Sequence, residues 1–273
     1  MTLQHAPADL QAFVDEWRAW HQQQEARIAD AHGFLAITNL HWLTEQSQRF
    51  ADAPGEWSTG PDGIVVVLGE GEELVIDGAP VRGEHHFGLI PERGSVNATW
   101  KDAVIEVARR AGHDIIRPRH PETPLRTGFT GTPAYAPHPR WVATGRYVPF
   151  DEPRPTTVGA AVEGLEHVYD APGRVEFELD GHELALTAFP GHSPGTLTLL
   201  FTDATSGVTT YAANRVLALD PPAADGTVVL DFNRAVNLPC AYTDLATCPL
   251  PPAENRLPVP IEAGEKIPYE RGA

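Results

Sequence analysis

Cysteine, methionine and long apolar runs are scarce in this 273-residue chain, which has two cysteines and one methionine. A small secreted domain stapled by disulfides carries several cysteine pairs, so Cys240 and Cys248 are expected to be thiols. No stretch approaches the roughly 20 apolar residues of a membrane-spanning helix, and the N-terminus lacks a basic-then-apolar signal pattern. These absences predict a soluble protein of the cytoplasm with no membrane partner.

Positive charge is scarce as well. The 20 basic and 37 acidic side chains give a formal net charge of -17, which would repel a phosphate backbone. The glycine-rich fingerprints of dinucleotide-binding proteins and P-loop enzymes are missing, and so is an intact Gly-x-Ser-x-Gly elbow. We therefore expect no nucleic-acid partner, no cofactor and no standard α/β enzyme.

The first part of the chain predicts one amphipathic helix. Apolar residues recur at helical spacing from Asp9, a candidate N-cap, to about His32, and Gly33 provides a stop. Its aromatic side chains are typical of a stripe that faces a core. We expect residues 1–33 to form the N-terminal helical segment.

Two strand-rich blocks follow the helix and predict a mainly β fold. In the first block, residues 34–135, short apolar runs alternate with turn residues, and a Pro-rich stretch at 117–139 predicts a crossing loop or boundary. The second block, 136–273, contains Asp180-Gly181 between two alternating runs, which predicts a hairpin with a type I′ turn. A second hairpin is predicted from 196–201 and 208–219. With no crossover-length helical pattern between them, the strands predict antiparallel sheets of sandwich or barrel type.

The chain ends in an irregular Pro-rich segment from Asp231 onward, which carries the most distinctive pattern. This segment resembles the domain of unknown function 1684 family. The matching residues are Asp231-Phe232-Asn233-Arg234, Asn237, Pro239-Cys240-Ala241, Cys248-Pro249-Leu250-Pro251-Pro252, Glu254-Asn255-Arg256-Leu257-Pro258 and Glu262-Ala263-Gly264-Glu265. Weaker similarity extends upstream over most of the chain. The resemblance implies a shared fold and assigns no activity.

Prolines restrict this segment, so its polar side chains can be held at fixed angles with little entropic cost. Our leading hypothesis is a site for a small anionic or polar ligand. Arg234 and Arg256 would bind its charge, and three amides would orient it. These amides are Asn233, Asn237 and Asn255. In the alternative interpretation the same groups satisfy buried carbonyls of an irregular coil, and Asp231 pairs with an arginine.

Catalysis at the same place is a second hypothesis. In a hydrolytic enzyme Asp231 or Glu254 would act as the general base, with Arg234 as electrostatic stabiliser. Cys240 is a candidate nucleophile, although no histidine follows His192 in the sequence to serve as a neighbouring base. Cys240 could instead form a disulfide or redox pair with Cys248, or both thiols could be buried and inert.

The remaining patterns indicate no metal site. His85 and His86 are neighbours on an expected strand, where adjacent side chains point to opposite faces and cannot share one ion. A third functional hypothesis is a β interaction module without a pocket. The short strands of the first block are typical of a small β sandwich, and some such sandwiches bind phosphopeptides.

Overall fold

A computed structural model describes residues 7–271 and confirms a mainly β fold with an N-terminal helix and antiparallel sheets. The chain folds into two compact units. Within the described residues, the half-barrel unit comprises 7–25, Gly131–Asp244 and 248–271, and the sandwich unit comprises Ala26–Thr130 and Leu245–Thr247.

The first helix, α1 (Pro7–Ile28), differs from the sequence prediction at both ends. Asp9 lies inside the helix and does not cap it, because the helix already includes Pro7, a residue tolerated in a first turn. The helix ends before His32 because the Asp30 carboxylate accepts the His32 N–H at 2.9 Å, which favours a turn over a further helical bond.

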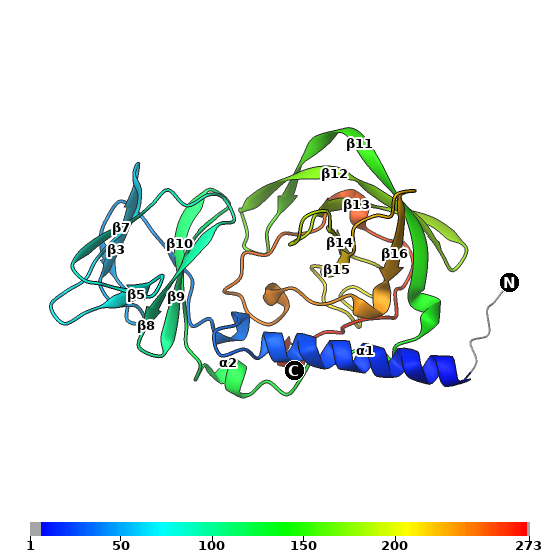
Figure 1. Ribbon diagram of the computed structural model, residues 1–273, viewed down its shortest axis with the longest axis horizontal. Helices are drawn as coiled ribbons and strands as arrows, with labels where there is room; N and C mark the ends of the chain where they lie inside the picture. Colours follow the sequence, from blue (N-terminus) through cyan, green and yellow to red (C-terminus); the bar gives the residue numbers. More distant parts are fainter. Residues whose placement is uncertain (1–6, 272–273) are drawn as a thin grey trace. The chain divides into compact units, whose positions relative to one another are not determined.

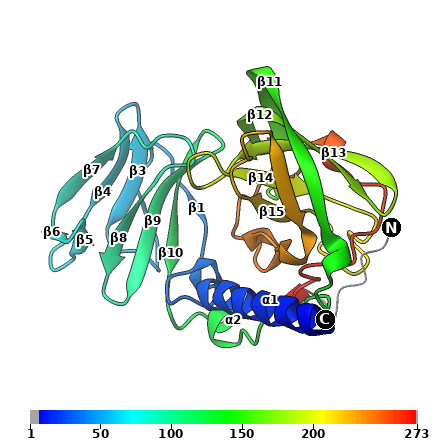
Figure 2. The ribbon, with the colours of Figure 1, turned by 45° about the vertical axis from the view of Figure 1, so that its right-hand side comes forward.

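The sandwich unit consists of two antiparallel sheets (Figures 1 and 2). The six-stranded sheet has the order β1-β10-β9-β8-β5-β6, and the four-stranded sheet has the order β2-β3-β4-β7. The strands are β1 (His41–Trp42), β2 (Gln48–Arg49), β3 (Glu56–Gly60), β4 (Gly63–Val67), β5 (Leu74–Ile76), β6 (Ala79–Val81), β7 (Glu84–Gly88), β8 (Ser95–Trp100), β9 (Ala103–Arg110) and β10 (His113–Arg119). Short helices η1 (Phe34–Ala36) and α2 (Pro124–Thr127) complete the unit.

The core of the sandwich unit lies between its two sheets. Trp57, Ile64 and Val66 come from the four-stranded sheet and pack in one cluster with Ile105 and Val107 of the other. Prolines do not exclude the whole 117–139 stretch from the sheet: β10 continues to Arg119, and Pro118 lies opposite Ile105. That part of the loop prediction is therefore wrong.

The half-barrel unit is built on one curled antiparallel sheet with the order β15-β14-β13-β12-β11-β16. Figure 1 shows the long β11 beside β12, and the edge strands β15 and β16 also contact each other. The strands are β11 (Val142–Gly159), β12 (Glu166–Leu179), β13 (His182–Pro190), β14 (Leu197–Phe201), β15 (Arg215–Leu219) and β16 (Thr227–Asp231). The core lies against this sheet and includes Val175, Leu186 and Leu199.

The hairpin of β12 and β13 is confirmed, with φ of 49° at Asp180 and 79° at Gly181, as a type I′ turn requires. The second hairpin differs from its prediction, because β14 pairs with a strand that begins only at Arg215. The Thr205 carbonyl accepts three successive N–H groups, from Val208, Thr209 and Thr210, which holds that stretch in turns. Val208 is 74% exposed, so its apolar character does not mark a strand.

The Pro-rich segment after β16 packs its apolar side chains into the core of the half-barrel unit. From Leu257 to Ala263 every second residue is buried, which is the period of an extended chain. The buried Arg215 guanidinium holds this coil by donating to the Ile261 carbonyl at 3.0 Å and to the Ala263 carbonyl, and it pairs with Asp203 at 2.7 Å. Short 3-10 helices interrupt the loops: η2 (Pro139–Trp141), η3 (Phe232–Arg234), η4 (Pro239–Ala241), η5 (Ala253–Asn255) and η6 (Tyr269–Arg271).

Candidate functional site

Asn233 and Asn255, two of the predicted ligand-orienting amides, face the protein's own backbone. Asn255 is fully buried, accepts the Thr187 N–H at 2.7 Å, and donates to the carbonyls of Thr187 and Leu200. Asn233 bonds both the N–H and the carbonyl of His138. These contacts account for both side chains as supports of irregular main chain, so a ligand would have to displace existing bonds to reach them.

The two predicted arginines differ in their burial and in their partners. Arg234 is half-buried and pairs with Glu16 at 2.7 Å and Asp231 at 3.2 Å, with its guanidinium 5.5 Å from the centre of the Trp20 ring. Arg256 is exposed. Asp231 also accepts two bonds from Asn233. Arg234 is therefore already bound to carboxylates of α1 and β16.

The other predicted catalytic residues are engaged as well. Glu254 is exposed and accepts the Thr187 hydroxyl at 3.1 Å. Cys240 is buried, and its N–H lies 3.2 Å from the Cys248 sulfur. The largest influence on Cys240 is a side-chain hydrogen bond with Cys248, which lowers the pKa of the Cys240 thiol. The structure thus brings together two buried free cysteines.

A buried carboxyl group that sequence reasoning did not single out lies at the end of the family signature. Gly264 has a φ of 73°, and a Cβ there would clash with the Ala235 carbonyl, so glycine is needed to direct Glu265 inward. Glu265 is 1% exposed and accepts the Asn237 N–H at 2.6 Å and the Tyr242 hydroxyl at 3.4 Å through one oxygen. Burial raises the pKa of Glu265 to about 7.

The second oxygen of Glu265 faces His21 of α1. It lies 3.9 Å from His21 Nε2, too far for a hydrogen bond, and neither atom has a hydrogen-bond partner among the described residues. His21 stacks on Trp17, and burial lowers its pKa. The amide oxygen of Asn237 is also buried without a partner there. This cluster is polar and under-satisfied, but its tight burial leaves those atoms almost no solvent-accessible surface.

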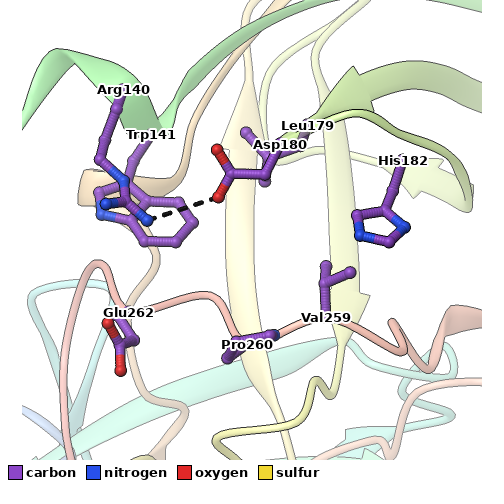
Figure 3. A pocket seen from close by; sticks show the side chains of 8 residues that line it. All are labelled: Arg140, Trp141, Leu179, Asp180, His182, Val259, Pro260 and Glu262. Carbon is purple, nitrogen blue, oxygen red and sulfur yellow. Dashed lines mark hydrogen bonds and ion pairs between the residues drawn. The ribbon is translucent and has the colours of Figure 1, made fainter.

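An open pocket of about 180 Å³ lies where the C-terminal coil meets the β12–β13 hairpin and η2. Figure 3 shows Arg140 and Asp180 facing each other, with His182 on the far side of Asp180. Along the coil, Glu262 lies on the Arg140 side and Val259 on the His182 side, with Pro260 between them. The buried residues Trp141, Leu179 and Val259 supply an apolar surface.

The electrostatics of this pocket centre on Arg140. Its guanidinium lies 4.4 Å from the centre of the Trp141 ring, which is within the range of a cation–π contact. It donates to Asp180 at 3.4 Å, and both side chains are more than half exposed, so this pair contributes little and can exchange partners. Glu262 is exposed beside it. The pocket thus offers a movable cation–carboxylate pair and a second carboxylate.

Among residues 7–271, no cluster of three His, Cys, Asp or Glu side chains is arranged to hold a metal ion. Nor does any described helix combine the length and apolarity needed to cross a membrane.

The model of a family described as protein of unknown function (DUF1684) matches residues 127–266, just over half of the chain. The chain belongs to the DUF1684 family. A solution NMR structure of an uncharacterized protein from Haloarcula marismortui is 31% identical to it, over 52% of this chain and 79% of that one, with a TM-score of 0.44. No curated protein matches.

The DUF1684 match includes the whole pocket and Glu265, but sequence reasoning did not select them. Glu265 was visible as part of the signature, but His21, which faces its second oxygen, lies outside the matched residues. Arg140 follows Pro139 in a loop without a recognisable motif. The one usable signal was the Asp180-Gly181 turn, because a turn of that type presents its side chains at the end of a sheet.

Proposed function

We propose that this DUF1684 protein binds a small polar molecule carrying a carboxylate, of about amino-acid size, in the pocket of Figure 3. The observation that supports this is Arg140, which is held over Trp141 while its exposed partner Asp180 is 3.4 Å away. A ligand carboxylate could take two guanidinium N–H bonds in place of this weak pair.

The acceptors around Arg140 favour a ligand that also carries an amine. Binding of a carboxylate to Arg140 would release Asp180, and Glu262 lies nearby on the coil. The two carboxylates would then attract an ammonium group. The volume of about 180 Å³ is below the roughly 300–1,000 Å³ of pockets for drug-sized ligands, so the ligand is small.

The sequence-based roles of Arg234, Arg256 and the three asparagines remain predictions, and so do the hydrolytic alternative at Asp231 or Glu254 and the interaction module. The pocket proposal keeps the C-terminal segment as part of the site, through Val259, Pro260 and Glu262. It replaces the predicted anion-binding arginines with Arg140.

A thermal-shift screen of amino acids and related zwitterions tests the proposal, because a ligand that binds the native state raises Tm. We expect a hit with the wild type, with at least about tenfold weaker binding in Arg140→Ala. Arg146→Ala is the matched control, since it removes an exposed arginine of β11 that does not line the pocket. Equal loss of binding in both variants would point to general charge and refute the pocket.

A further inference from the structure

The Cys240 and Cys248 corner of the half-barrel unit has no part in the proposed ligand pocket. Cys240 belongs to η4, and the chain returns eight residues later to place the Cys248 sulfur 3.2 Å from the Cys240 N–H. Their burial is almost complete, with exposed fractions of 3% and 7%. A loop that returns this tightly brings two thiols within reach of one another without a large movement of the backbone.

The surroundings of the pair fix Cys240 more firmly than an ordinary loop residue. The Tyr211 hydroxyl donates to the Cys240 carbonyl at 2.8 Å, and Arg271 approaches the same carbonyl at 3.4 Å. On the other side, the Cys240 sulfur lies 3.9 Å from the Asn214 amide oxygen, while the Asn214 amide nitrogen donates to the Pro249 carbonyl at 2.6 Å. Asn214 therefore contacts both Cys240 and Pro249, the residue that follows Cys248.

We propose that Cys240 and Cys248 are a modification site, a dithiol that a peroxide converts reversibly into an intramolecular disulfide, with Cys240 oxidised first. The contact with Cys248 favours the thiolate of Cys240, which is the nucleophilic form. Burial opposes the thiolate but is outweighed, and the nearby Arg271 guanidinium adds a smaller favourable effect. Burial restricts access to an oxidant close to water in size, which selects hydrogen peroxide over bulky disulfides.

The chemistry balances in two steps. The Cys240 thiolate attacks one peroxide oxygen, the O–O bond breaks, and the products are a sulfenic acid and hydroxide, which takes up a proton to become water. The Cys248 sulfur then attacks the Cys240 sulfur, the S–S bond forms, and the sulfenic oxygen leaves as a second water with the thiol proton. Two thiols are oxidised and one peroxide is reduced.

Intact-mass spectrometry tests this directly, because the chain has only two cysteines. Wild-type protein is treated with hydrogen peroxide, quenched with catalase and alkylated under denaturing conditions. We expect a loss of about 2 Da, no alkylation of either cysteine, and full reversal by dithiothreitol. Peptide mapping should join Cys240 to Cys248 within one chain.

Two single variants, each checked for folding by circular dichroism, identify the first sulfur. In Cys248→Ser, dimedone should trap a sulfenic acid at Cys240, and in Cys240→Ser the labelling of Cys248 should be at least about tenfold slower. Equal labelling rates would overturn the assigned order. Wild-type protein that keeps two alkylatable thiols under peroxide treatment, or that forms only disulfides between chains, would overturn the site, and this wild-type result does not depend on the variants.

Discussion

Replacing Glu265 with glutamine should stabilise the protein at alkaline pH. The glutamine side chain has nearly the same shape, and its amide oxygen can still accept the Asn237 N–H. Its NH2 group then takes the place of the carboxyl oxygen that faces His21 without a partner. The substitution therefore imitates protonated Glu265 at every pH.

The size of this stabilisation follows from the pKa of Glu265. Glutamate has an ordinary pKa of 4.5, and burial raises that of Glu265 to about 7. The folded state therefore holds this proton more tightly than the unfolded state, so its contribution to stability is complete below pH 4.5 and is lost as the pH rises to 7. The difference corresponds to about 3 kcal/mol. His21 acts in the opposite direction, because its lowered pKa reduces stability as the pH falls below 6.5.

Urea unfolding of wild type and Glu265→Gln between pH 5 and pH 9 separates the two effects, since the difference between the proteins isolates Glu265. Trp17 stacks on His21, so tryptophan fluorescence includes a reporter of this region. Glu262→Gln removes the same charge at an exposed position nearby and should change the unfolding free energy by less than about 0.5 kcal/mol. A Glu265→Gln difference that is equal at pH 5 and pH 8 would refute the reasoning.

Two further substitutions test the structural assignments of polar residues. Asn255→Ala should lower the unfolding free energy by about 3 kcal/mol in urea unfolding, because it leaves the buried backbone groups of Thr187 and Leu200 unpaired. Asn97→Ala, at an exposed position, is the control. Similar losses of unfolding free energy in the two variants would contradict the structural role of Asn255. In the sandwich unit, burial opposes ionisation of Glu106, but Arg117 and Arg119 outweigh it and lower its pKa to about 2. Glu106→Gln should therefore cost about 3 kcal/mol at pH 7, and the gap from wild type should close as the pH falls from 4.5 to 2; a gap that does not change with pH would be inconsistent with this ion cluster.

The sequence correctly predicted the secondary-structure elements that are determined by neighbouring residues. The Asp180-Gly181 hairpin followed from two adjacent residues that tolerate positive φ, and α1 followed from a repeating apolar stripe. The predicted strand at 208–219 failed over residues 208–214, because the Thr205 carbonyl accepts the N–H groups of residues 208–210 and holds them in turns, while the Asp203 carboxylate accepts the N–H of Thr205 itself. Apolar side chains alone do not distinguish an exposed turn from a strand.

The candidate site depends on contacts between residues far apart in the sequence. The sequence therefore indicated the C-terminal segment better than it indicated the roles of the residues in that segment. Asn233 and Asn255 were selected as polar residues on a rigid coil, and their partners at His138, Thr187 and Leu200 lie far away in sequence. The pocket needs the hairpin, η2 and the coil together, and no local pattern predicts that Arg140 and Glu262 line the same pocket.

The most direct test of the pocket is an NMR titration of the ¹⁵N-labelled protein with the zwitterion found by the thermal-shift screen, observing backbone amides and arginine Nε–H signals. Our account predicts saturable shifts at the Arg140 side chain, at the Asp180-Gly181 turn and near Glu262, with little change at Arg146. Shifts centred on Arg234 and Arg256, with Arg140 unchanged, would contradict it and return the ligand to the site predicted from the sequence.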